Sequence, residues 1–573
     1  MKVFSELKKN LKKDFSHLKP VKVALLGDTA TQLLSQAIRA AGYDKNLNLD
    51  IWEAGFDQIE QEIQNASSEL FEFKPELIII YQSSQKLLEK YNKLKPEAYI
   101  QLAAGRMEMI DALCKNIEAK LRVPIIYYNY TEIDDGIFGN YANQVEPSFL
   151  FQLRKLNHDL MLYSVHHPQL HICDLSGIQN RSGKSWIFQP SIYIQSEMGL
   201  SIDSLPWVAE RTLALIRAIL GHSKKCLILD LDNTVWGGIL GDDGMENIQI
   251  GSLGIGKAFT AFQYWVKKLK NRGIIIAVCS KNTESLAKEP FEKHPDMILR
   301  LEDIAVFKAN WDSKMDNIQQ IQQVLNISYD SMVFLDDDPL ERNLIREHIP
   351  DIAVPELPPD PADYLEYLCS LDLFETVSLS TEDAERTKRY QTEARRDSER
   401  QHYFDEDVFL KNLHMTSAVE AFNKFNGPRV SQLSNRSNQF NLRTVRYSQA
   451  EIDLISRSPG HFTFSFSLED KYGDSGLVSM IILKKETLDT LFIDTWLMSC
   501  RVLKRGMEAF VLNTLADFGK TNGFRYLKGE YIATPKNEMV KDHYPRLGFV
   551  EKDGFWVLDL NLFTRMNTHV NLQ

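Results

Sequence analysis

Short apolar runs alternate with longer helical stretches through the first two thirds of this chain. The first series of runs lies at residues 21–26, 77–81, 123–128 and 170–175. A second series begins at residues 226–229 and continues at 273–278 and 331–335. Apolar strands separated by helices are typical of parallel sheets that are covered by helices on both faces. The pattern therefore predicts a multidomain α/β fold.

The length of the chain requires several hydrophobic cores. At 573 residues it is too long for one core, and a prior of about 150 residues per domain suggests three or four units. A proline cluster ends the second series, at Pro355, Pro358, Pro359 and Pro361. Strands near 460–468, 476–483 and 491–498 and a helix at 506–520 then predict an α+β domain. We expect domains at residues 1–220, 221–375 and 406–573, with a charged helical connector at 376–405.

Composition limits the classes of partner and the cellular location. The formal net charge of −12 argues against nucleic acid as the main partner, because phosphate binding favours a basic face. Charged residues occupy the start of the chain, and no apolar run reaches membrane-spanning length, so we expect a cytoplasmic protein with no membrane partner. The six cysteines form no C-x-x-C pair, so neither a zinc site nor a disulfide framework is predicted.

Two carboxylates follow the apolar run at 226–229. Asp230 and Asp232 would lie at the carboxyl end of a buried strand, where ligands bind in open α/β sheets. Alternate residues of an extended segment share a face, so both can address one substrate. An ionised Asp230 is suited to attack phosphorus, and Asp232 is suited to protonate the leaving oxygen and later to deprotonate water.

Two further strand ends carry complementary groups. The run at 273–278 leads to Ser280 and Lys281, a hydroxyl and an ammonium suited to phosphate oxygens. The run at 331–335 leads to Asp336 and Asp337, a concentration of negative charge that a hard cation such as Mg²⁺ would neutralise. These strand ends predict a Mg²⁺-dependent phosphoryl-transfer site.

A lysine between the last two strands would complete this site. Lys314 opens a predicted helix and is the favoured candidate, with Lys308 as the alternative. It would reach the transferred phosphoryl group and keep the nucleophile ionised. The distance along the chain from Thr234 to Ser280 is taken up by a glycine-rich turn and one helix, which leaves no room for a folded cap domain. We therefore expect an open site that admits a large or protein-borne substrate.

In this order, these residues resemble the four motifs of the haloacid dehalogenase superfamily. The resemblance implies catalytic roles for Asp230, Asp232, Thr234, Ser280 and Lys314. It implies Mg²⁺ as the cofactor, with the metal held by Asp230, Asp232, Asp336 and Asp337. It also implies phosphate binding by Ser280, Lys281, Asn282 and Lys314. The central domain is then expected to be a Rossmann-like domain of this superfamily without a large cap.

Longer stretches look like the FkbH-like branch of that superfamily. They lie at residues 231–238, 241–244, 280–282 and 334–342, and at 432–433, 438–442 and 474–478 in the C-terminal domain. This resemblance implies that a glyceryl unit is loaded from 1,3-bisphosphoglycerate onto the thiol of a phosphopantetheinylated acyl carrier protein, with loss of phosphate. The implied setting is the biosynthesis of polyketide-type natural products.

The C-terminal domain resembles the GNAT acyltransferase fold. A predicted strand there leads into a basic helix start, and the free amides of a helix N-terminus can hold a phosphate. Lys504 stands where the GNAT loop has its first glycine, and this departure argues against acetyl-CoA binding. The candidates for holding a pantetheine phosphate are Arg501, Lys504, Arg505 and Gly506. The alternative is a basic helix start that binds no ligand.

Two other features suggest chemistry without completing a site. Gly27-Asp28-Thr29 follows a strand where SGNH esterases carry Gly-Asp-Ser, but Thr29 holds the nucleophile position and no downstream Asp-x-x-His is found. We therefore expect a degenerate, flavodoxin-like or SGNH-like N-terminal domain that binds a substrate or a partner. Cys279 adjoins Ser280 and is a candidate for an acyl thioester, although strand alternation points it away from the face of Ser280.

Three functions remain open from the sequence. The first is the glyceryl-loading enzyme, and the second is a phosphatase that acts on another small or carrier-bound phosphate. The third is a non-catalytic scaffold that docks assembly-line proteins. The complete set of Asp230, Asp232, Ser280, Lys314 and Asp336 favours the two enzymes.

Overall fold

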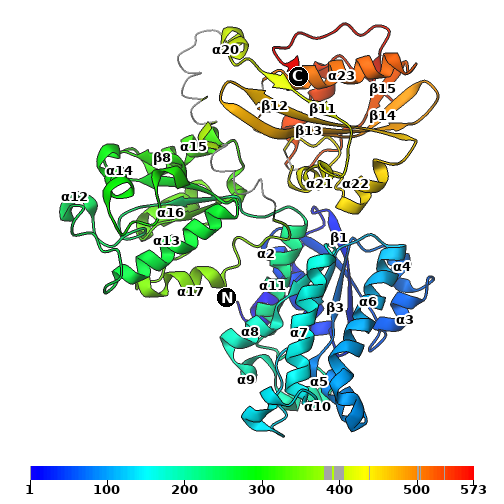
Figure 1. Cartoon of the computed structure of the whole chain (residues 1–573), viewed down its shortest axis with the longest axis vertical. Coiled ribbons are helices and arrows are strands. Elements are labelled where there is room, and N and C mark those ends of the chain that lie inside the picture. Colours follow the sequence, from blue (N-terminus) through cyan, green and yellow to red (C-terminus); the bar gives the residue numbers. More distant parts are fainter. Residues whose placement is uncertain are drawn as a thin grey trace. The chain divides into compact units, whose positions relative to one another are not determined.

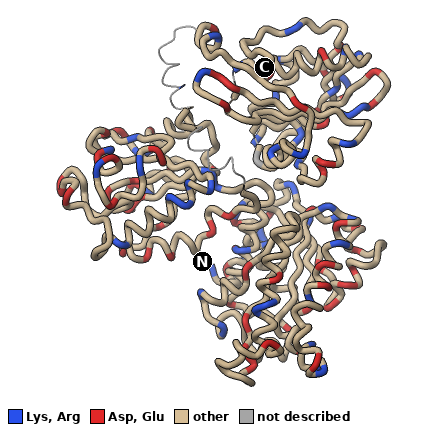
Figure 2. Tube along the Cα trace, viewed as in Figure 1, with Lys and Arg blue, Asp and Glu red and all other residues tan. Residues whose placement is uncertain are grey.

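The computed structural model describes most of the chain (Figure 1). The described residues are 2–379, 390–392, 396, 406–437, 439–499, 502–503, 505–534 and 536–573. Most of the predicted connector at 376–405 lies outside them. The chain divides into two compact units, one of residues 1–219 with 375–377 and one of residues 220–374 with 378–573. Lys and Arg are interspersed with Asp and Glu along both units (Figure 2), so the excess acidic charge is not confined to one segment.

The first unit is built on a five-stranded parallel sheet. Its strands have the order β2-β1-β3-β4-β5. They are β1 Pro20–Gly27, β2 Asn48–Glu53, β3 Leu77–Tyr81, β4 Ile125–Tyr128 and β5 Leu170–Cys173. The order reverses between β1 and β3, the place where doubly wound sheets bind ligands. The sequence did not reveal β2, because this edge strand is polar and only partly buried.

The second unit begins with a four-stranded parallel sheet of order β8-β7-β6-β9. Its strands are β6 Cys226–Leu229, β7 Ile275–Ser280, β8 Ile304–Ala309 and β9 Met332–Leu335. Strand β8 was not predicted. Both faces of the sheet are buried: Leu227 packs with Phe259 and Phe262 of α13 (Gly256–Asn271), and Ile228 packs with Ile318 of α15 (Lys314–Leu325). This two-sided burial explains the continuous apolar runs and confirms the predicted α/β architecture.

The same unit continues into a mainly antiparallel sheet. Strands β12 (His461–Asp470), β13 (Gly473–Lys485) and β14 (Thr490–Met498) are antiparallel neighbours. Helix α23 (Met507–Thr521) follows, and β15 (Tyr526–Gly529) then returns parallel to β14. This arrangement is the α+β domain that the sequence predicts. Among the helices of the described residues, none is both long and apolar enough to cross a membrane.

Candidate active site

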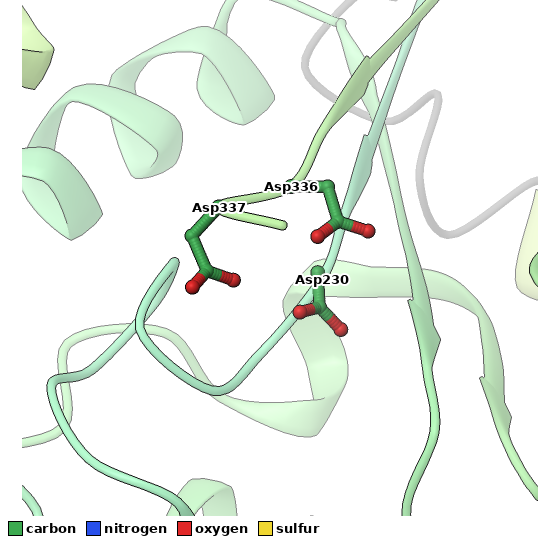
Figure 3. A group of neighbouring side chains, drawn as sticks. All are labelled: Asp230, Asp336 and Asp337. Carbon is green, nitrogen blue, oxygen red and sulfur yellow. The ribbon is translucent and has the colours of Figure 1, made fainter. Parts of the chain in front are cut away.

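Three carboxylates meet at the carboxyl edge of the central sheet. Strands β6 and β9 are neighbours, so Asp230, directly after β6, lies beside Asp336 and Asp337, directly after β9. The Asp230 amide donates a hydrogen bond to the Leu335 carbonyl at 2.9 Å, which extends the pairing of the strands into the site. One carboxylate oxygen from each of the three aspartates lies within 4.8 Å of the others, and the three side chains are neighbours at the strand ends (Figure 3).

Lys314 places a positive charge against two of these carboxylates. Its Nζ atom lies 3.1 Å from Asp230 Oδ1 and 2.6 Å from Asp336 Oδ2, and its side chain is only 5% exposed. Burial lowers the pKa of Lys314, but the two carboxylates outweigh burial and raise it, so the side chain stays cationic. The alternative candidate, Lys308, donates instead to Gln320 at 2.8 Å. The structure therefore brings Lys314 to the predicted site.

One lysine does not balance three clustered carboxylates, of which Asp230 and Asp336 are buried and Asp337 is half-buried. Burial and the charge of Asp230, opposed by Lys314, together raise the pKa of Asp336 to about 6. Burial, and then the charge of Asp336, raises the pKa of Asp337 to about 6. Burial also raises the pKa of Asp230, although Lys314 opposes this change. Hard oxygen ligands with surplus negative charge fit a divalent cation such as Mg²⁺.

Asp232, predicted as a fourth metal ligand, is not part of this group. Its Oδ1 atom accepts hydrogen bonds from Trp236 Nε1 at 3.0 Å and from the Leu240 amide at 3.1 Å. Its Oδ2 atom lies 3.4 Å from Asn282 Nδ2, which is the donor. These contacts hold the Asp232 carboxylate on the loop that follows β6. They suit a proton donor and acceptor at a fixed position, and they place Asn282 against Asp232.

Of three other predicted residues, Ser280 and Thr234 contact the aspartates of the site, whereas Lys281 does not. The Ser280 hydroxyl, at the end of β7, forms a hydrogen bond that favours the ionised form of Asp230. The Thr234 hydroxyl accepts a hydrogen bond from the Asp337 amide at 3.1 Å, so it fixes the backbone that carries the Asp337 carboxylate. Lys281 is more exposed, with Nζ 2.5 Å from Glu341 Oε1. In this structure it lies in an ion pair outside the three-carboxylate group.

Arg342 was not singled out from the sequence as a site residue. It lies on α16 (Pro339–His348), where its Nη1 atom donates to the backbone carbonyls of Asp336 and Asp337, both at 2.7 Å. Its Nε atom donates to Glu356 at 3.0 Å. Arg342 therefore braces the loop that presents two carboxylates. The sequence signal for this role was a basic residue in the first turn of the helix that follows the acidic strand end. Basic residues are common at such positions, so the signal was not specific.

Cys279 is buried on the face of the sheet that α15 covers. Its side chain is 0% exposed and belongs to the apolar cluster that contains Ile228 and Ile318. Its Sγ atom donates to the Lys314 carbonyl at 3.7 Å, and burial raises the pKa of the thiol. A buried, protonated thiol without access to substrate is a poor nucleophile. The structure thus argues against the acyl thioester that adjacency to Ser280 suggested.

The approach to the site carries no cap. Between β6 and β7, all residues are described, and their helices are the four-residue α12 (Leu240–Asp243) and α13. Two large apolar side chains are exposed in the segments that carry the site residues: Trp311, three positions before Lys314, is 74% exposed, and Leu340, three positions after Asp337, is 73% exposed. This part of the sheet edge therefore offers apolar surface to a partner.

The predicted pantetheine site takes a different form in the structure. Arg501 and Lys504 lie outside the described residues. Arg505 is buried, and its Nη1 atom lies 3.5 Å from Asp470 Oδ2. Gly506 precedes α23 with φ of 77°, and its carbonyl accepts a hydrogen bond from Thr568 Oγ1 at 2.8 Å. Arg505 is therefore engaged in a buried ion pair, which argues against its role as a phosphate ligand.

The role of Arg342 in holding the Asp336 and Asp337 loop can be tested by substitution, with Arg346 as a matched control. Arg342→Ala removes both hydrogen bonds to the carbonyls of Asp336 and Asp337, and we expect the Kd for Mg²⁺ to rise about 10-fold to 100-fold. Arg346→Ala is the control, because Arg346 contacts Glu356 and the Val354 carbonyl but neither aspartate. Isothermal titration calorimetry with Mg²⁺ measures both. Equal affinities in the two variants would contradict the role given to Arg342.

The raised pKa values of Asp336 and Asp337, both about 6, predict how metal binding depends on pH. Protons and Mg²⁺ compete for the same oxygens, so affinity is highest above these values and falls as the pH drops through about 6. Below that value we expect a loss of about tenfold per pH unit for each proton displaced. Asp337→Asn removes one titrating group and should make the dependence shallower. Calorimetry across this range would refute the prediction if affinity stayed constant.

Comparison with known proteins agrees with this geometry. The family model of the FkbH N-terminal domain matches residues 22–217. The chain is also similar to the crystal structure of the N-terminal part of the protein BF1531 from Bacteroides fragilis, which contains a phosphatase domain and is complexed with Mg. The identity is 54%, the match covers 66% of this chain and 100% of that chain, and the TM-score is 0.64. No curated protein matches the chain.

Weaker likenesses link the chain to acetyltransferases. The ribosomal-protein-S18-alanine N-acetyltransferase from Escherichia coli is 16% identical, with 26% of this chain and 99% of that chain covered and a TM-score of 0.20. The spermidine N-acetyltransferase from Vibrio cholerae is 12% identical, with 25% and 96% covered and a TM-score of 0.21. These likenesses assign no activity to the chain. The match spans the whole of the crystallised N-terminal part of BF1531, and together with the FkbH domain it shows that this chain belongs to the FkbH-like proteins of the haloacid dehalogenase superfamily.

Proposed function

We propose that this chain is a Mg²⁺-dependent phosphatase that also forms a glyceryl thioester on an acyl carrier protein. The observation that carries the phosphatase activity is the contact of Lys314 with Asp230 and Asp336 beside a third carboxylate. A nucleophile, a buried cation and a set of hard oxygen ligands thus share one strand-end site. The Mg²⁺ complex of the BF1531 phosphatase-domain structure supports the same cofactor here.

The residues of the site divide the chemistry of phosphate removal. The Asp230 carboxylate attacks phosphorus, the bond from phosphorus to the leaving oxygen breaks, and Asp232 supplies the proton to that oxygen. Asp232 then takes a proton from the water that hydrolyses the aspartyl phosphate. Lys314 and Ser280 favour the ionised form of Asp230 against the effect of burial on its pKa. Bound Mg²⁺ would supply charge neutralisation for the phosphoryl oxygens, held by Asp230, Asp336 and Asp337.

The proposed substrate is 1,3-bisphosphoglycerate and the proposed partner is a phosphopantetheinylated acyl carrier protein. The carrier thiol would attack the acyl phosphate carbon, so that a C–S bond forms, the C–O bond to phosphate breaks and the thiol proton passes to solvent. The acyl phosphate is already activated, so positioning is the main requirement for this step. The phosphomonoester that remains requires the site around Asp230. The uncapped approach and the exposed Trp311 and Leu340 support a protein-borne substrate.

Replacement of the nucleophile tests the phosphatase activity. Asp230→Asn leaves no carboxylate to attack phosphorus, and we expect phosphate release to fall by about three orders of magnitude or more while the protein stays folded. Asp338→Asn is the matched control, because Asp338 caps α16 through the Leu340 amide and is not one of the three clustered carboxylates. Phosphate release with and without a chelator is the assay. Undiminished release by Asp230→Asn would overturn the assignment.

Intact-protein mass spectrometry of the carrier protein tests the thioester product. With 1,3-bisphosphoglycerate, the wild-type chain should add one glyceryl group, whereas Asp230→Asn should leave a phosphoglyceryl group because dephosphorylation is blocked. Cys279→Ser should still give the glyceryl adduct, since a thiol with 0% exposure does not reach the substrate. Absence of any adduct, together with efficient hydrolysis of free small phosphates, would favour the phosphatase alternative and exclude glyceryl loading.

A further inference from the structure

The first unit holds a second cluster of buried polar groups at the carboxyl edge of its sheet. Asp28 and Thr29 directly follow β1, and Gln82 and Ser83 directly follow β3. All four side chains are buried. Strands β1 and β3 are adjacent, and the strand order reverses between them, so these residues lie at the point where doubly wound sheets bind ligands. Neither the phosphatase site nor the proposed thioester chemistry uses them.

A buried guanidinium in this region lacks a carboxylate partner. Arg106, on α6 (Leu102–Lys120), is 5% exposed. Its Nε atom donates to the Tyr130 hydroxyl at 2.9 Å, and its Nη1 atom lies 3.6 Å from Met109 Sδ. No described carboxylate lies within ion-pair distance of it. An arginine stays protonated, and the Asp28 carboxyl that interacts with it electrostatically is itself held partly neutral by burial, so this position favours an anionic ligand.

The hydrogen-bond network around Arg106 fixes its direction without neutralising it. The Tyr130 hydroxyl lies 2.8 Å from the Tyr127 hydroxyl, which donates to Gln82 Oε1 at 2.6 Å. This chain of neutral groups connects α6 with the ends of β4 (Tyr127) and β3 (Gln82). The guanidinium is therefore held at the strand ends by groups that add no negative charge. The remaining guanidinium N–H groups have no hydrogen-bond partner among the described residues of this unit.

Asp28 adds a group that can donate or accept. Its carboxyl accepts a hydrogen bond from the Ser83 amide at 2.8 Å. Burial raises the pKa of Asp28 to about 7; the Ser83 amide, Arg106 and Lys90 oppose this rise, and Asp57 adds to it. The protonated carboxyl is therefore well populated near neutral pH. The buried Thr29 hydroxyl lies beside the Tyr81 hydroxyl but forms no hydrogen bond of standard geometry, so it too is available to a ligand.

We propose that this edge of the N-terminal sheet binds a small monocarboxylate, with Arg106 as its counter-charge and Asp28 and Thr29 as hydrogen-bond donors. A planar carboxylate matches the fork of N–H groups on a guanidinium, and its single charge balances the single charge of Arg106. A phosphate dianion would bring a second negative charge next to Asp28. The site is separate from the carboxylate cluster on β6 and β9 and does not depend on the proposed thioester chemistry.

Calorimetric titration of the full chain with glycerate, acetate and inorganic phosphate tests the proposal. Arg106→Met should weaken glycerate and acetate binding by at least about tenfold, because it removes charge-assisted hydrogen bonds. Arg39→Met is the matched control, since Arg39 also donates to a tyrosine hydroxyl, that of Tyr43, but is exposed. Phosphate release should be unchanged in both variants. The assignment would be overturned if glycerate and acetate bound equally well to the wild type and to Arg106→Met. It would also be overturned if Arg106→Met weakened phosphate binding as much as carboxylate binding.

Proton uptake provides a second measurement that needs no destabilising variant. A bound carboxylate favours the protonated form of Asp28, so binding should take up a fraction of a proton near pH 7, and affinity should rise as the pH falls through about 7. Titration of the wild-type chain in two buffers of different ionisation enthalpy measures this uptake. Asp28→Asn keeps a donor and should bind without uptake. Binding of glycerate by the wild type without proton uptake would contradict the role of Asp28.

Discussion

The contact of the Lys314 ammonium with Asp230 and Asp336 is the interaction on which the central site depends. Three carboxylates at the ends of two adjacent strands repel one another and lose hydration on burial. Lys314 compensates part of this cost, at 3.1 Å and 2.6 Å from two of them. Because one lysine leaves surplus negative charge, the same arrangement that stabilises the nucleophile as an anion also creates affinity for a divalent cation. Folding of the sheet and assembly of the metal site are therefore linked.

The groups behind the carboxylates keep this charged cluster in place. Arg342 holds the backbone carbonyls of Asp336 and Asp337, and the Thr234 hydroxyl holds the Asp337 amide. These contacts connect the loop after β9 to α16 on one side and to the loop after β6 on the other. A reactive site of this kind needs its ligands positioned before substrate arrives, since a small displacement costs catalytic rate. The N-terminal unit presents the opposite situation, in which the buried Arg106 cation has no ion pair with a described carboxylate and its Asp28 neighbour is held partly neutral by burial, so that an external anion is the proposed partner.

Much of the fold followed from local pattern. Continuous apolar runs predicted β6, β7 and β9, because strands covered on both faces need apolar side chains in both directions. The pattern missed β2 and β8: β2 is a partly buried edge strand, and Phe307 and Lys308 of β8 are only partly buried. Residue types at strand ends also predicted which side chains would gather, since parallel strands in one sheet end at the same edge. The sequence pattern does not give the order of the strands in the sheet, so it does not show which strand ends are neighbours.

The sequence by itself determined the chemistry available to this protein: the strand-end carboxylates, the lysine between the last two strands and the absence of a cap-sized insertion. Only the tertiary structure decided how that chemistry is used, because contacts between distant residues depend on strand order and side-chain direction. It placed Lys314 and not Lys308 at Asp230, tied Asp232 to Trp236 and Leu240, and buried Cys279 under α15. It also left Arg106 without an ion pair to any described carboxylate. The physical reason is that charge balance and burial are properties of neighbours in space, which a linear pattern of residue types does not specify.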